Sequence, residues 1–157
     1  MRNGERLVHE EKVKSNWVDY NGHMNVAYYV LIFDHATDAF FELLDMGEQY
    51  RNKTKSSNFV VESHVSYIRE VVKGDLLQVA CMLLNYDTKR IHLFHHMYNA
   101  SNGELCATIE LLIIHVDLVS RRSAVFPGEI LKNLQIYLED QKSFIFPEQA
   151  GSIIGLK

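Results

Sequence analysis

The chain has 157 residues, of which 47% are hydrophobic and 23% are charged. This length fits one domain with its own core, and the composition is too apolar for a disordered chain. The formal net charge is −4, from 16 Lys and Arg against 20 Asp and Glu, and there is no long basic run, which disfavours nucleic-acid binding. We expect a single domain over 1–157, with a core over about 6–140 and a C-terminal tail over 141–157.

The first residues, MRNGERLVHEEK, lack the apolar segment of a secretory signal. No stretch approaches the roughly 18 uninterrupted apolar residues that a membrane span requires. We therefore expect a cytoplasmic protein that does not contact a membrane. Cys81 and Cys106 lie in apolar runs without a C-x-x-C pair, which predicts buried, reduced thiols.

The first predicted elements are a strand over about 6–17 and a long helix over 26–45. The helical segment, VAYYVLIFDHATDAFFELLD, contains no Pro or Gly, and Gly47 supplies a stop. Its acidic residues share an arc of roughly 80° when projected at about 100° per residue, and they are Asp34, Asp38, Glu42 and Asp45. The rest of the circle is apolar, so we expect the sheet to wrap this helix and a partner subunit to cover more of it.

A polar linker over 50–58 precedes four β-branched or aromatic runs at 59–68, 76–86, 90–100 and 104–118. The turns between them, VKGD, YDTK and ASNGE, are short and favour antiparallel hairpins. After Pro127 and Gly128, the run EILKNLQIYLED has helical spacing and predicts a shorter amphipathic helix. The order predicts an α+β fold in which one antiparallel sheet surrounds one helix.

The segment WVDYNGHMNV, residues 17–26, places a tight polar turn directly before the long helix. A helix N-terminus presents unpaired N–H groups and a partial positive charge, which stabilise a developing oxyanion. Here those amides belong to Val26 and its neighbours. Gly22 allows a sharp turn and close substrate approach, and Asn25 suits the capping position. Asp19 adds a carboxylate a few residues upstream.

A carboxylate beside such amides predicts acyl transfer, in which Asp19 attacks a carbonyl or activates a water molecule. A thioester is the natural target, because its carbonyl is less resonance-stabilised than that of an amide. The plainer alternative is that Asp19 only closes a turn, as Asp and Asn often do. His23 can orient the carboxylate, contact substrate, or be satisfied by neighbouring backbone.

The run VDYNGHMNVAYYVLIF resembles the Asp-x-x-Gly-His-x-Asn turn and central helix of hotdog-fold acyl-CoA thioesterases, the 4-hydroxybenzoyl-CoA thioesterase-like group. Further runs, ESHVSYIREVVKGD, YDTKRIHLFHHMY and IIHVDLVSRRSAVF, are similar to strands of the betainyl-CoA thioesterase branch of carnitine metabolism. The resemblance covers about residues 8–130.

This resemblance implies a homodimer or a dimer of dimers with active sites at the subunit interface, and no cofactor, since coenzyme A is part of the substrate. The family's carboxylate falls on Asp19, and its oxyanion-holding amide falls near Val26. One departure is that many relatives have Asn where this chain has Val26. Only the Val26 backbone can then contribute, and a side-chain donor must come from His23 or Asn25.

The betainyl branch acts on a thioester with a trimethylammonium group, which aromatic faces and a carboxylate can hold. Aromatic residues at such positions are often simply part of the hydrophobic core. Glu62 and His64 lie on one face of their strand, where they can supply a counter-charge for a cationic substrate or equally form a solvent-exposed ion pair. The candidate substrate-binding residues are Trp17, Tyr20, Gly22, Tyr28, Glu62, His64 and Tyr67.

We expect no metal, because His92 and His96 on one strand face lie about 13 Å apart at about 3.3 Å per residue, and His95 faces the other way. Two other functions stay open. A hotdog enoyl-CoA hydratase or dehydratase also places acidic and His side chains near the helix. A non-catalytic acyl-CoA binding protein would use Asp19 only as a turn residue.

Overall fold

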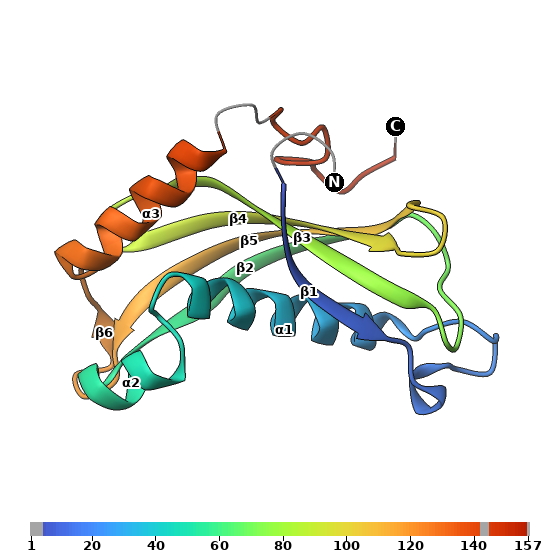
Figure 1. Cartoon of the computed structure of the whole chain (residues 1–157), viewed down its shortest axis with the longest axis horizontal. Helices are drawn as coiled ribbons and strands as arrows, with labels where there is room; N and C mark the ends of the chain where they lie inside the picture. The colour runs from blue at the N-terminus through green and yellow to red at the C-terminus, as the bar shows by residue number, and fades with distance from the viewer. Residues whose placement is uncertain (1–4, 142–144, 157) are drawn as a thin grey trace.

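The computed structural model describes residues 5–141 and 145–156 as a curved antiparallel sheet that arches over one long helix (Figure 1). A 3-10 turn, Ser15–Trp17, follows the first strand. In chain order, the elements are β1 (Arg6–Lys12), α1 (Val26–Leu43), α2 (Glu48–Thr54), β2 (Ser56–Tyr67), β3 (Leu76–Tyr86), β4 (Arg90–Asn99), β5 (Leu105–Asp117), β6 (Arg122–Ser123) and α3 (Gly128–Asp140). The predicted α+β plan of one sheet around one helix is confirmed.

The strands lie in the order β1-β3-β4-β5-β2, with β6 paired to β5. The predicted hairpins β3–β4 and β4–β5 are confirmed. The hairpin predicted at VKGD is wrong, because β2 pairs with β5 and not with β3. Residues 68–75 instead carry the chain between strands that are not neighbours, and the amides of Ile68 and Arg69 are held by the Cys106 carbonyl on the way.

Helix α1 packs its apolar side against the inner face of the sheet. It begins at Val26 as predicted and ends at Leu43, two residues before the predicted end. Asp45 then adopts a left-handed backbone, φ 59°, and Gly47 precedes α2. The acidic arc is confirmed, because Asp34, Asp38, Glu42 and Asp45 are all exposed.

The linker predicted over 50–58 is wrong, because it contains most of α2 and the start of β2. This helix is short and polar, so its sequence carries no apolar period. It is held instead by contacts with distant residues: the Glu42 carboxylate accepts from the Glu48 amide at 3.0 Å, and Tyr50 Oη lies 2.9 Å from His115 Nε2. Glu48 lies in the first turn, where a negative charge favours a helix.

The two faces of the sheet have different residues. The inner face of β4 carries Ile91, Leu93 and Met97 in the core with α1, while His92 and His96 point to the outer face. The C-terminal segment lies over this outer face, where the Gly151 amide donates to Glu110 Oε2 at 2.7 Å. The sheet thus separates the environment of α1 from an outer face on which histidines lie beside buried apolar residues such as Met82 and Phe94.

The predicted shorter helix is α3, which closes one end of the core. Tyr137 meets Phe40 of α1 edge-on at 5.1 Å, and the Gln141 side chain bonds both backbone groups of Leu83 at 2.9 Å. Cys81 and Cys106 are buried and unpaired, as predicted. Within residues 5–141 and 145–156, the helices are too short or too polar to cross a bilayer.

His95 is a fully buried histidine that faces α1, as its place in the strand predicts. Thr37 Oγ1 donates to the Phe33 carbonyl at 2.8 Å, so its contact with His95 Nε2 at 3.0 Å requires a proton on that nitrogen. His95 therefore donates from Nε2. Burial, with a smaller contribution from nearby His96, lowers the pKa of His95 to about 3.

This burial predicts a stability that declines with acidification. Between pH 6.5 and about pH 3, His95 is protonated in the unfolded chain but not in the folded chain. The free energy of unfolding should therefore fall by up to about 1.4 kcal/mol per pH unit below 6.5. In His95→Leu this slope should weaken, as measured by urea unfolding at pH 7, 6 and 5. His64→Gln, a change at a half-exposed histidine, should keep the wild-type slope, and equal slopes in all three proteins would contradict the assignment.

Candidate active site

Residues 18–24 form a small closed turn in front of α1. Val18 and Met24 make an antiparallel bridge, and the Asp19 amide donates to the His23 carbonyl at 3.0 Å. The Gly22 amide closes the tip by donating to the Asp19 carbonyl, also at 3.0 Å. Gly22 has φ 83°, a left-handed conformation that glycine adopts without steric cost. The predicted role of Gly22 in turning the chain is therefore confirmed.

The turn is fastened to the fold on two sides. The Asn25 amide donates to the Trp17 carbonyl at 2.9 Å, which fixes the start of the turn against the start of the helix. The Met24 amide donates at 2.7 Å to the carbonyl of Val71, which lies in the connection between β2 and β3. Trp17, Met24 and Val71 are all buried. Asp19 therefore belongs to a loop with a defined position relative to α1.

The Asp19 carboxylate is partly used by the turn itself. Its Oδ1 accepts from the Asn21 amide at 2.8 Å, which is the turn-closing role that the sequence left as an alternative. A carboxylate offers about four lone-pair positions on two oxygens, so one bond leaves capacity for a water molecule or a substrate. Asp19 is half-buried, and its neighbour Tyr20 is 96% exposed, so the turn can be reached from solvent.

The first turn of α1 provides the amide donors. The Asn25 side chain accepts from the Ala27 amide at 3.0 Å, which confirms the predicted cap, and the Tyr28 amide bonds the Asn25 carbonyl. These contacts leave Val26 as the candidate oxyanion donor of this turn. No acidic residue lies in the first helical turn, so the positive end of the helix dipole is not neutralised there.

His23 is oriented by a residue that the sequence did not single out. Its Nε2 lies 3.1 Å from Glu70 Oε2, and both side chains are largely exposed. A surface pair of this kind contributes little stability, so its main effect is to set the direction of the ring. The structure thus places His23 in the same turn as Asp19, with its ring paired to Glu70.

The predicted aromatic residues separate into two pairs and one free side chain. Trp17 and Tyr28 stack with centroids 5.3 Å apart and an interplanar angle of 16°, and Tyr67 meets Tyr29 edge-on at 5.3 Å. Tyr20 extends into solvent. Lys14 Nζ lies 4.4 Å from the Trp17 ring centroid, so the Lys14 ammonium covers this face of the buried indole.

Glu62 and His64 lie on the outer face of the sheet. His64 is paired in register with Glu110, whose Oε1 is 2.7 Å from His92 Nε2. Together with Gly151 and neighbouring residues, these four side chains line a hollow of about 350 Å³. Because α1 packs on the other face, a single subunit does not bring Glu62 or His64 beside Asp19. The structure does bring Trp17, Asn25, Val26 and Tyr28 to the same end of α1 as Asp19.

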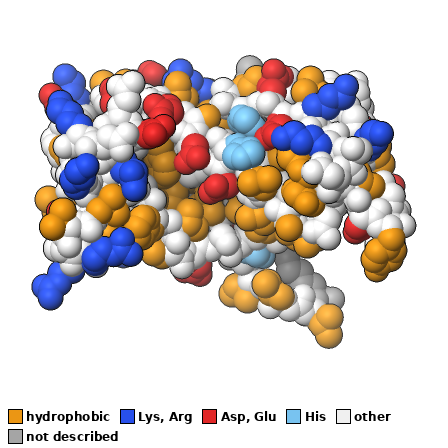
Figure 2. All heavy atoms as spheres, turned by 90° about the horizontal axis from the view of Figure 1, so that it is seen from below, with side chains coloured by type: hydrophobic (Ala, Val, Ile, Leu, Met, Phe, Trp, Pro, Cys, Tyr) orange, Lys and Arg blue, Asp and Glu red, His pale blue; other side chains and the backbone are white. Residues whose placement is uncertain are grey.

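A larger hollow, of about 810 Å³, lies between α2 and α3 and includes Tyr50, Pro127 and Ile136 in its lining. Its lining includes Glu42, near the C-terminal end of α1, so it lies at the other end of this helix from the turn. On the α1 side of the molecule, acidic and histidine side chains gather near the centre (Figure 2).

The sequence profile of the thioesterase-like superfamily matches residues 13–134. The chain belongs to this superfamily. It is 37% identical over 149 residues to betainyl-CoA thioesterase from Pseudomonas aeruginosa, covering 95% of this chain and 94% of that protein. It is 34% identical over 152 residues to L-carnitine dehydrogenase/betainyl-CoA thioesterase from Rhizobium meliloti, covering 97% of this chain and 30% of that longer protein.

Solved structures agree with this assignment. A Staphylococcus aureus protein in complex with CoA has a TM-score of 0.91 and 29% identity to this thioesterase, covering 98% of this chain and 97% of its own. The fold is the hotdog fold, and the protein is an acyl-CoA thioesterase. The predicted family and its betainyl-CoA thioesterase branch are therefore confirmed, and thioester hydrolysis is favoured over the hydratase and non-catalytic alternatives.

The Asn25 cap generates a prediction about how the turn is held. Asn25→Ala removes the acceptor for the Ala27 amide and should destabilise the protein by about 1 kcal/mol, while Asn25→Ser restores a capping oxygen and should recover most of this loss. Urea unfolding of the three proteins measures the difference. An alanine variant as stable as the serine variant would show that the cap contributes nothing.

Proposed function

We propose that this thioesterase hydrolyses betainyl-CoA or a similarly short acyl-CoA, releasing free CoA and the carboxylic acid. The observation that carries the proposal is that the turn containing Asp19 is bonded to the start of α1 through Asn25, where no acidic residue of the first helical turn offsets the dipole. The substrate itself is suggested by the 37% identity to betainyl-CoA thioesterase.

In the proposed reaction, the thioester oxygen lies near the Val26 amide, and negative charge that develops on it is stabilised by that donor and the helix dipole. Asp19 either attacks the carbonyl carbon or takes a proton from an attacking water molecule. If Asp19 attacks, the C–S bond breaks to give CoA thiolate and a mixed anhydride, which water then hydrolyses to the acid and free Asp19. If water attacks, Asp19 takes its proton, the C–S bond breaks directly to give the acid, and the proton passes to the CoA thiolate. No cofactor is required, since CoA is part of the substrate.

In this proposal the exposed Tyr20 ring beside the turn offers an aromatic face to the trimethylammonium group of a betainyl substrate, because Trp17 is itself buried. The Trp17 indole already faces the Lys14 ammonium, and Tyr28 stacks on the same indole. Tyr20 projects from the turn and is free to close over a bound acyl group. Glu62 and His64 lie on the other face of the sheet, so their role as counter-charge requires the outer face of a second subunit near the turn.

A second copy of the chain completes this site in our proposal, as a homodimer or a dimer of dimers. The strand β2 forms one edge of the sheet and exposes Phe59, Val60 and Val61. Such an edge offers unpaired backbone groups and an apolar surface to a partner. Its Tyr67 end contacts Tyr29 near the start of α1, so a partner on this edge would lie close to the turn.

Replacing Asp19 tests the chemistry. Asp19→Asn preserves the shape of the turn but removes the base or nucleophile, and it should lower kcat for CoA release about 100-fold or more. The measurement is thiol release from betainyl-CoA, followed with a thiol-reactive dye. Asp87→Asn is a matched control, because Asp87 closes a similar turn by accepting from the Lys89 amide at 2.8 Å. Unchanged thiol release in Asp19→Asn would refute the role of the carboxylate.

The acyl group is tested with an isosteric pair of substrates. 3,3-Dimethylbutanoyl-CoA has the shape of betainyl-CoA without its charge, so cation–π contact should give betainyl-CoA a kcat/KM higher by about 3- to 30-fold. Tyr20→Leu should reduce this ratio more than it reduces hydrolysis of the neutral thioester. A preference of the wild type for the neutral isostere would exclude the aromatic site for a cation.

A further inference from the structure

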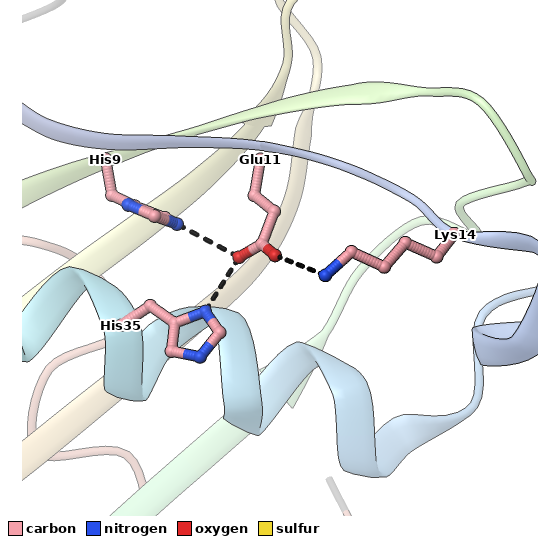
Figure 3. A network of polar contacts seen from close by, with 4 residues as sticks. All are labelled: His9, Glu11, Lys14 and His35. Atoms are coloured by element: carbon pink, nitrogen blue, oxygen red, sulfur yellow. Dashed lines mark hydrogen bonds and ion pairs between the residues drawn. The ribbon is translucent and has the colours of Figure 1, made fainter.

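Three potential metal ligands from two elements converge between the edge strand β1 and the middle of α1 (Figure 3). His9 Nε2 lies 3.1 Å from Glu11 Oε2, and His35 Nδ1 lies 2.7 Å from the same oxygen. The two imidazole rings meet at 68° with centroids 5.7 Å apart. One carboxylate oxygen therefore lies within hydrogen-bond distance of two imidazole nitrogens.

The fold places this cluster where an ion can reach it. His9 and Glu11 are two residues apart on β1, so their side chains project from the same face of the strand, toward α1. The exposed fractions are 24% for the His9 side chain, 15% for Glu11 and 38% for His35. The carboxylate is thus shielded, while the imidazoles border solvent.

The charge of the cluster favours a cation. Burial alone would raise the pKa of Glu11, but hydrogen bonds from His35, His9 and Lys14 lower it to about 2. The group is therefore a carboxylate near neutral pH. A neutral imidazole and a carboxylate are both preferred ligands of zinc and similar divalent ions.

We propose that His9 Nε2, Glu11 Oε2 and His35 Nδ1 bind one divalent transition metal ion of the zinc class. The three atoms lie within 4.8 Å of one another. Bonds of about 2.0–2.2 Å in a tetrahedral arrangement require ligand atoms roughly 3.4 Å apart, which small rotations of these side chains provide. Two histidines and one glutamate make a three-ligand set that leaves the fourth position to water.

The ion would act as a clamp and not as part of the thioester chemistry. It would join β1, which is held on one side by β3 alone, to the helix that positions the proposed active site. Because only the folded chain brings residues 9, 11 and 35 together, ion binding would add to the stability of the fold.

Lys14 opposes the ion in this arrangement. Its ammonium lies 3.2 Å from Glu11 Oε1 and supplies the positive charge that a metal ion would otherwise provide. Neutralising Lys14 should therefore tighten metal binding, whereas a purely structural role of the cluster would give no such gain.

The expectation of no metal from the sequence rests on His92, His95 and His96. The proposed site uses other residues, His9, Glu11 and His35. Within 5–141 and 145–156, His9, Glu11 and His35 form the one group of three His, Cys, Asp or Glu side chains whose ligand atoms come this close. Their spacing along the chain has no metal-site signature, because 24 residues separate Glu11 from His35.

The test uses the untagged full chain, stripped with EDTA and titrated with zinc chloride by calorimetry at pH 7.5. We expect one ion per chain, and a loss of at least about 10-fold in affinity in His9→Ala and in His35→Ala. His92→Ala is the matched control, because His92 also pairs with a glutamate, Glu110, but lacks a third ligand, and it should bind zinc as the wild type does. Lys14→Met should bind more tightly.

Thermal unfolding provides a second measurement that does not depend on calorimetry. Zinc should raise the Tm of the wild type and of His92→Ala but not that of His35→Ala, and the gain should shrink at pH 6, where protons compete for imidazole nitrogens. His35→Asn serves if the alanine variant does not fold. No zinc binding by the wild type, or equal binding by the His9, His35 and control variants, would overturn the proposal. Thioester hydrolysis is a separate readout, so either proposal can fail alone.

Discussion

The burial of α1 against the inner face of the sheet is the constraint on which the rest of the structure depends. It fixes the direction of the helix, and with it the place where its unpaired amides emerge. The backbone bonds from Asn25 to Trp17 and from Met24 to Val71 then attach a polar turn to that end. The geometry of the proposed active site therefore depends on core packing, together with the side-chain bonds of Asp19 and Asn25 within the turn.

The sequence predicts those parts of the fold whose cause is local. A long apolar run without Gly or Pro predicts α1. Gly22 predicts the turn and Asn25 predicts the helix cap, because only a few residue types suit those positions. Prediction from the sequence fails where an element depends on contacts with residues outside its own segment. The helix α2 is stabilised by Glu42 and Tyr50 contacts outside any periodic pattern, and the length of a turn does not reveal that β2 pairs with β5.

The candidate site likewise has a part that the sequence predicts and a part that it does not. Asp19 and the helix start are predictable because they are neighbours in the chain, whereas Val71 contributes only a backbone carbonyl and so leaves no signature. Glu62 and His64 share a strand face, as the alternation of side chains requires, but alternation does not say which face meets the helix. The outer-face position follows from the register of β2 with β5, which depends on a bulge between Val60 and Glu62.

The strand order also has a consequence for how the chain emerges during synthesis. The first two strands to be made, β1 and β2, are the opposite borders of the finished sheet, and neither is the neighbour of the other. β1 must wait for its neighbour β3, and β2 must wait for β5, so the nascent protein carries unsatisfied β backbone until β5 has left the ribosome. The sheet that covers α1 is therefore complete only after β5 has joined β2.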